Sequence, residues 1–347
     1  GSAGFCVGGR SPFSAVEPGS GSTIMSYASL CNEQDLSQSA DDYFHAISLE
    51  QMNDFITNGA GATCGVVTNS VNNLPTVDAG NDFVIPVQTP MVLTAQAEDA
   101  DDDQVTYTWE QVDKGNNFGD ATGSVAEMVD NGTRPLFRTF KPTTESMRYL
   151  PQMTDVLANT TSLGETYATT SRDLNFRVTV RDGNGGVTFD DMKVTTSDAA
   201  GPFVVNEPIQ GVHWQGEGEH KVAWDVANTN LPPISCGRVD ILLSTDNGQT
   251  FTTNLATTDN DGEHMLPTPS LAATQARIKV KCADNIFFNV TTGNFSITPL
   301  NKAPVVTTPN NITVAASDAN GTSTLNEAIV NFLNQASAVD ESEGNVS

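Results

Sequence analysis

The densest group of potential ligand side chains in this sequence is an acidic run made of Glu98, Asp99, Asp101, Asp102 and Asp103. The run stands between two segments with the alternating pattern of strands, so it is expected in an inter-strand turn. Carboxylates and backbone carbonyls there can supply the six to eight oxygens that Ca²⁺ prefers. The run lacks the full spacing of an EF-hand loop. It therefore indicates either a calcium site or a solvated acidic turn.

Histidine chemistry is limited by number and by spacing. The sequence has 4 histidines, which are His45, His213, His220 and His264. No two of them are four residues apart, so the sequence contains no HExxH motif. A catalytic zinc site needs three protein ligands close in space and a carboxylate that acts on the bound water. We predict that this chain cannot build such a site alone.

Charge and hydrophobicity exclude several classes of partner. The chain has 16 basic and 42 acidic residues in 347, a formal net charge of -26. Repulsion from phosphates makes nucleic acid and anionic membranes unfavourable partners. No apolar run of about 18 residues is present, so we expect no membrane span. The length is sufficient for two to four domains.

One stretch resembles a known protease motif. The Gly/Ser-rich turn from Gly19 runs into Thr23-Ile24-Met25-Ser26-Tyr27, and it is flanked by Cys6, Glu17-Pro18 and Asp41 to Ala46. This arrangement resembles the Met-turn and closing segment of a bacterial reprolysin-like (metzincin) zinc metallopeptidase. The resemblance implies that Met25 forms an apolar floor beneath the zinc, whereas outside that family it would be an ordinary core methionine. Tyr27 matches the astacin and serralysin tyrosine that approaches the zinc or the oxyanion, although reprolysins often have proline there.

The resemblance also implies what lies outside these residues. Metzincins place H-E-x-x-H-x-x-G-x-x-H just upstream of such a segment. We therefore expect zinc, and cleavage of a protein or peptide substrate, in a longer parent protein only. Residues 1–347 alone are expected to be inactive.

The cysteines fit an oxidising compartment, because none of the 5 is spaced as CxxC in a sequence dominated by strand and turn residues. We expect a secreted or cell-surface protein. Cys236 and Cys282 flank the strands of one β-domain and are predicted to pair, as are Cys6 and Cys31. In reprolysins a cysteine after the last helix reaches back to an upstream partner, which implies that Cys64 lacks its mate here.

Periodicity places these residues in four units. Apolar positions at helical spacing predict an amphipathic helix over residues 41–58, capped by Ser39 or Asp41, which closes a metzincin-like segment at residues 1–72. Residues 73–199 resemble a PKD-type immunoglobulin-like sandwich, with Trp109 in its core, a hairpin at residues 182–186 and a long insertion at residues 115–172.

The remaining residues continue the β-rich pattern. Residues 200–300 predict a second immunoglobulin-like sandwich, in which Ser244 to Phe251 matches the Asp-box S-x-D-x-G-x-T-F/W, a structural turn. Residues 301–347 resemble the start of a HYR or cadherin-like module. Its acidic turn, with Asp340, Glu341 and Glu343, is a second candidate for calcium. Because such modules occur in arrays, we expect the natural protein to continue past Ser347.

The fold class is therefore mostly β, with tandem immunoglobulin-like sandwiches preceded by a small helical metzincin segment. Two functions remain open. The first is the C-terminal part of a secreted zinc endopeptidase with accessory modules. The second is a non-catalytic extracellular array for adhesion, spacing or fibre and surface assembly. The presence of an intact upstream zinc motif distinguishes them.

Overall fold

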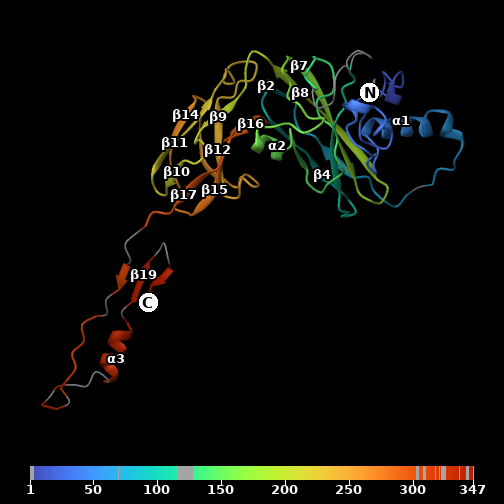
Figure 1. The fold of residues 1–347 in the computed structure, drawn as a ribbon. Coiled ribbons are helices and arrows are strands. Elements are labelled where there is room, and N and C mark those ends of the chain that lie inside the picture. The colour runs from blue at the N-terminus through green and yellow to red at the C-terminus, as the bar shows by residue number, and fades with distance from the viewer. Residues whose placement is uncertain are drawn as a thin grey trace.

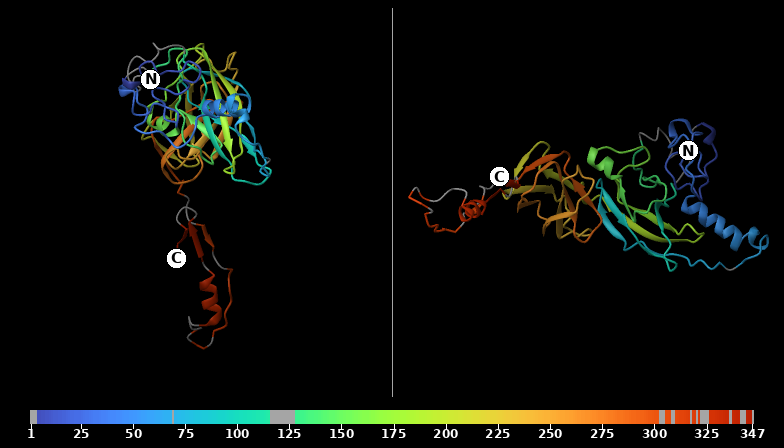
Figure 2. Two further views of the ribbon diagram at one scale, coloured as in Figure 1. Left: turned by 90° about the vertical axis from the view of Figure 1, so that its right-hand side faces the viewer. Right: turned by 90° about the horizontal axis from the view of Figure 1, so that it is seen from below.

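The structure is a computed structural model. It describes residues 4–68, 70–115, 128–301, 305–307, 310–316, 318–319, 321, 326–335, 337–340 and 344–346. The N-terminal segment lies against a first β-sandwich, a second sandwich follows, and a smaller third unit projects beyond it (Figures 1 and 2). Among the described residues, no helix has the length and apolar character needed to cross a membrane.

The N-terminal segment consists mainly of loops with four short helical elements. These are η1 (Gly4–Cys6), η2 (Asn32–Gln34), α1 (Ala46–Thr57) and η3 (Ala60–Thr63). The helix predicted from residue 41 begins later, because the His45 side chain caps it by accepting from the Ile47 N–H at 3.2 Å. Asp41 is not the cap, and its own N–H donates to the Ser22 carbonyl.

The cysteines pair as predicted. Cys6 is bonded to Cys31 in the N-terminal segment, and Cys236 to Cys282 in the second sandwich. All four are almost completely buried. The thiol of Cys64 is free and exposed.

The first sandwich has a four-stranded sheet in the order β2-β8-β7-β5, faced by the pairs β1-β4 and β3-β6. Alternate residues of β7 point into the core, where Leu174, Phe176 and Val178 surround Trp109. The Trp109 indole donates to the Ser146 carbonyl at 3.0 Å, so its polar edge is satisfied. The strands are β1 (Thr76–Asp78), β2 (Phe83–Pro86), β3 (Met91–Thr94), β4 (Gln96–Glu98), β5 (Thr106–Gln111), β6 (Met147–Leu150), β7 (Arg172–Arg181) and β8 (Val187–Ser197).

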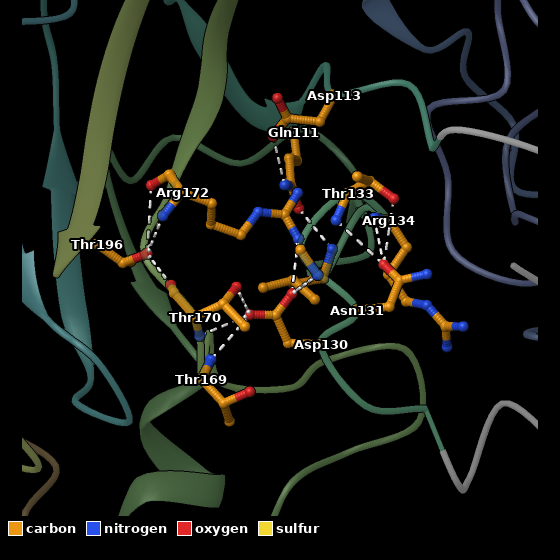
Figure 3. A network of polar contacts seen from close by, with 12 residues as sticks. Gln111, Asp113, Asp130, Asn131, Thr133, Arg134, Thr169, Thr170, Arg172 and Thr196 are labelled. Atoms are coloured by element: carbon orange, nitrogen blue, oxygen red, sulfur yellow. Dashed lines mark hydrogen bonds and ion pairs between the residues drawn. The ribbon is translucent and has the colours of Figure 1, made fainter. Parts of the chain in front are cut away.

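Residues 115–172, predicted as an insertion with few clear strands, contribute directly to this sandwich. Within them β6 pairs with β3, and α2 (Met153–Ala158) follows. A polar network anchors the preceding loop (Figure 3). There the Asp130 carboxylate accepts from Arg172 at 2.9 Å and from Thr170, whose hydroxyl is 2.7 Å away. Burial opposes ionisation of Asp130, but these hydrogen bonds lower its pKa overall.

The second sandwich is built from one large sheet, β10-β17-β15-β12-β13 with β16 beside β15, and a smaller sheet, β14-β11-β9. Its strands are β9 (Val204–Glu207), β10 (His213–Gln215), β11 (Glu219–Asp225), β12 (Arg238–Ser244), β13 (Thr253–Asp259), β14 (Glu263–Pro267), β15 (Ala273–Cys282), β16 (Phe288–Val290) and β17 (Phe295–Thr298). The third unit contains α3 (Glu327–Asn334) and a sheet of β18 (Val305–Thr307), β19 (Ser337–Asp340) and β20 (Gly344–Val346).

The two sandwiches share one hydrophobic core. At their junction, Phe203 and Phe287 meet edge to face with ring centroids 5.3 Å apart. Backbone bonds cross the same junction, from the Val92 N–H to the Ile286 carbonyl and from the Phe288 N–H to the Pro90 carbonyl, each 3.0 Å long. Apolar burial and main-chain bonds therefore act together to join the two sandwiches here.

The Asp-box turn takes part in this junction. Asp246 accepts from the hydroxyls of Ser244 and Thr250 at 2.6 Å, which closes the turn. Gly248 has a φ of +84°, and a Cβ there would lie 2.4 Å from a methyl of Leu157 on α2. The first sandwich therefore packs directly on the turn, and this contact requires glycine.

Lys279 on β15 is a buried cation at the junction, with 5% of its surface exposed. Its ammonium lies 4.2 Å from the centroid of the Phe288 ring and 4.8 Å from that of Tyr149. Aromatic faces attract a desolvated cation. Burial nevertheless lowers the pKa of Lys279 to about 8.

This shift predicts a pH dependence of stability. Between pH 8 and 9.5 the unfolded chain keeps a proton on Lys279 that the folded chain loses, so stability should rise with pH over this range. Replacing Lys279→Met should flatten the rise. The measurement is the melting temperature at several pH values, with Lys193→Met on β8 as the exposed control. An identical pH profile for wild type and Lys279→Met would contradict this account.

Candidate functional site

The turn that resembles a Met-turn is organised by one carboxylate. Glu17 accepts from the Ser22 N–H at 2.8 Å and from the Thr23 hydroxyl at 2.7 Å. Gly21 has a φ of +74° and sits so close to Glu17 that a Cβ would approach its carboxylate to 2.8 Å. The Tyr27 N–H returns to the Ser20 carbonyl at 2.9 Å. Together these bonds fix the direction in which the next residues point.

Met25 and Tyr27 face a cavity of about 700 Å³ between this turn and α1. Met25 is 67% exposed, so it is not an ordinary core methionine in these residues. The Tyr27 hydroxyl donates to the Gly9 carbonyl at 3.3 Å. The turn thus presents an apolar side chain and a phenol to one open space.

Helix α1 supplies the opposite wall of this cavity. Its apolar residues Met52, Phe55 and Ile56 fall at the predicted helical spacing, but 38%, 56% and 61% of their surfaces are exposed. These three side chains are thus open to the cavity and to solvent and are not enclosed in a core of the described residues. The large open apolar area has the character of an interaction surface.

A buried carboxylate anchors the start of α1 to the first sandwich. Both oxygens of Glu110, on β5, accept from the Ala46 N–H at 3.1 and 3.2 Å, and the Thr179 hydroxyl donates at 3.0 Å. Such a carboxylate satisfies an unpaired N–H at a helix N-terminus and complements its dipole. Burial nevertheless raises the pKa of Glu110 to about 7.

His45 lies beside this carboxylate, with its Nε2 3.9 Å from a Glu110 oxygen. Burial lowers the pKa of His45 to about 4, so the imidazole is neutral near pH 7. Its Nδ1 is occupied as the cap of α1. His45 therefore acts in positioning the helix and is not placed as a metal ligand.

The described residues do not fit a catalytic zinc ion. Each of the other histidines, all in the second sandwich, has a different partner: His213 contacts Ser296, His220 stacks on Trp214 and His264 contacts Thr258. In the described part of the chain, the one group of three or more His, Cys, Asp or Glu side chains arranged to hold a metal lies elsewhere, in the first sandwich. No zinc chemistry can be derived for these residues alone.

That group consists of Asp99, Asp103 and Asp182, whose nearest carboxylate oxygens lie within 4.8 Å of one another. One Asp99 oxygen, Oδ2, is buried and has no hydrogen-bond partner among the described residues. Asp182 is 4% exposed, and a hydrogen bond from the Asn72 amide lowers the pKa of its carboxyl. Three carboxyl groups with an unsatisfied buried oxygen suit a divalent cation that prefers oxygen ligands.

The predicted acidic run converges only in part. Asp99 and Asp103 belong to the cluster, but Glu98 ends strand β4 as an exposed residue. Asp101 instead binds the Asn73 backbone and amide, at 2.6 and 2.8 Å. Asp102 is exposed in the left-handed region with a φ of +60°. Within this tight turn only Asp99 and Asp103 point toward a common centre, and the other three carboxylates point away from it.

The second candidate calcium turn falls mostly outside the described residues. Glu341 and Glu343 lie outside the described residues, and Asp340 is described only as the last residue of β19.

Asp182 was missed as a ligand, because its neighbourhood reads as a glycine-rich hairpin turn. The one signal in the sequence is that the turn begins with a carboxylate, Asp182. The hairpin places it opposite the acidic run, and Asn184 donates to Asp103 across the gap at 2.7 Å.

No protein-family model and no curated protein sequence matches this chain. Solved structures of tandem modules do align with it. Fibronectin(III)-like modules of Clostridium thermocellum CbhA share 10% identity over 65% of this chain and 94% of theirs, with a TM-score of 0.21. The Ig1-2 module of the Drosophila receptor protein tyrosine phosphatase DLAR shares 9% identity over 65% of this chain and 100% of its own, with a TM-score of 0.34.

These matches concern the fold alone and carry no functional argument. The chain is mostly β, with tandem immunoglobulin-like sandwiches, as its sheets show. The peptidase resemblance of the N-terminal segment gains no support from the matches.

The anchoring role of Glu110 can be tested by two substitutions. Glu110→Ala removes the acceptor for Ala46 and Thr179 and should cost about 1–3 kcal/mol of unfolding free energy. Glu110→Gln keeps an acceptor of the same shape. The folded carboxyl holds a proton that the unfolded one loses from about pH 4.5 to 7, so wild type should lose stability relative to Glu110→Gln over that range. Urea unfolding at pH 5, 6, 7 and 8 measures both effects, and wild-type stability in Glu110→Ala would refute the anchor.

Proposed function

We propose that this chain is the C-terminal part of a secreted zinc-dependent endopeptidase, followed by a rigid array of immunoglobulin-like accessory modules. The zinc ligands would come from a polypeptide segment outside residues 1–347. The disulfides support an oxidising, extracellular location.

The observation that carries this proposal is the exposure of Met25 and Tyr27 on an ordered turn. A turn fixed by Glu17 holds both side chains against a cavity of about 700 Å³ with an apolar far wall. A methionine that is two-thirds exposed contributes little to the packing of these residues. It gains a function as the floor of a site completed by another segment.

The test compares two proteins. Residues 1–347 should contain no stoichiometric zinc and should cleave no casein, because no described residues supply a ligand set at Met25. A protein extended upstream through an HExxHxxGxxH segment should bind one zinc and cleave casein. Metal content by mass spectrometry and a cleavage assay measure both properties.

Chelation followed by zinc addition to the extended protein provides the control for metal dependence. One zinc per chain in the short protein would show that scattered residues form a site. An extended protein that lacks zinc and activity would overturn the peptidase proposal.

The second candidate function is a non-catalytic extracellular array for adhesion, spacing or assembly on a surface. The shared core of the sandwiches favours it, because a rigid pair holds its ends at a fixed separation. If the extended protein neither binds zinc nor cleaves casein, this second function is the one we propose, with protein partners at an extracellular surface.

We also propose that Asp99, Asp103 and Asp182 bind Ca²⁺. The orphaned Asp99 oxygen supports this, as does the position of the cluster where three segments meet: the linker at Asn72, the acidic turn and the 182–186 hairpin. A cation there would offset repulsion among the carboxylates and hold the segments together.

Calcium should therefore raise the melting temperature, and EDTA should lower it. At a free Ca²⁺ concentration 100 times the Kd, the unfolding free energy should rise by about 2.7 kcal/mol. Asp182→Asn should abolish the shift. Asp102→Asn is the matched control, because that residue is exposed and asparagine tolerates its left-handed backbone. Equal melting curves with and without Ca²⁺ would exclude the site.

A further inference from the structure

The segment that joins the N-terminal segment to the first sandwich is unusually open. Residues 62–68 are all exposed, and Val66 and Val67 expose 91% and 94% of their surfaces. Gly65 to Thr68 form no hydrogen bond with the other described residues. Two adjacent aliphatic side chains thus stand in water on a backbone that no sheet or helix protects.

Both ends of this open stretch are held. On the upstream side, η3 follows α1, and the Cys64 N–H closes its last turn on the Gly61 carbonyl at 3.0 Å. On the downstream side, Asn72 donates to Asp182 at 2.6 Å and Asn73 to Asp101. An exposed loop segment without backbone hydrogen bonds is the kind of site at which endopeptidases cut folded proteins.

The contacts between the N-terminal segment and the sandwich do not depend on this connection. Glu110 holds the start of α1, and Glu50 forms an ion pair with Arg177 at 2.9 Å. The Tyr43 hydroxyl donates to Thr139 at 3.1 Å, a contact that is buried. Cutting the linker therefore leaves the interface intact.

We propose that the Val66–Val67 bond is a proteolytic processing site, and that its cleavage converts the protein into two chains that stay associated. The agent is an endopeptidase that accepts small aliphatic side chains. Water adds across the peptide bond, leaving a carboxylate on Val66 and an ammonium on Val67. This inference does not rest on the zinc peptidase proposal.

The experiment uses the full chain and pancreatic elastase as the probe, under native conditions. Mass spectrometry should find new ends at Val66 and Val67 among the earliest products. Size-exclusion chromatography should then show both pieces eluting together, and separately after addition of urea.

Two variants make the test specific. Val67→Pro places a residue without an N–H after the scissile bond and should slow cleavage at this bond by about tenfold or more. Val71→Pro, at a fully exposed position of the same linker, is the control and should leave the Val66–Val67 bond cleavable. A bond that survives while other bonds are cut would overturn the processing site, and fragments that separate without urea would overturn the association.

Discussion

The junction between the two sandwiches is the constraint on which the rest of the structure depends. Phe203 and Phe287 join the two cores, and main-chain bonds cross beside them. Apolar surface that is removed from water stabilises the folded state by roughly 25 cal/mol per Å². A continuous core between the sandwiches therefore stabilises the fold far more than a polar contact between separate domains would. The array is consequently a single body up to the segment that leads to the third unit (Figure 1).

Burial changes the titration of one ionisable group at each of two contacts between neighbouring units. Glu110 anchors α1, and Lys279 lies among aromatic rings at the junction. Burial raises the pKa of Glu110, although the charge of Arg181 opposes this shift, and burial lowers the pKa of Lys279, so in both cases burial favours the neutral form. Hydrogen bonds satisfy the first, and ring faces compensate the second. At both sites, burial of an ionisable group costs some stability, and its contacts fix how two neighbouring units pack together.

The strongest sequence signals reported local structure well. The hairpin predicted at residues 182–186 joins β7 to β8, and the cysteine positions predicted both disulfides. Strand β6 was not predicted, because it is short and its partner β3 is far away in sequence. The helix α1 has the expected spacing but an exposed apolar face, since periodicity reports amphipathicity and not the identity of what covers it.

The candidate sites show the same limit. Met25 and Tyr27 could be named from a local motif, and the cavity beside them confirms that they share an open space. The contribution of Asp182 to the acidic cluster depends on a contact between distant turns, which spacing along the chain does not encode. Asp101 and Asp102 lie outside that cluster, because residues that are neighbours in sequence point in different directions within a tight turn.

The bonds between residues 90–92 and 286–288 have one more consequence. Strand β3 pairs with β6 on one side, and on its other side the second sandwich supplies the main-chain partners. An edge of the first sandwich that would otherwise present unpaired N–H and C=O groups is thus covered by its neighbour. The second sandwich therefore also protects this edge from pairing with the strand of another molecule, so the same contact that joins the cores limits edge-to-edge aggregation.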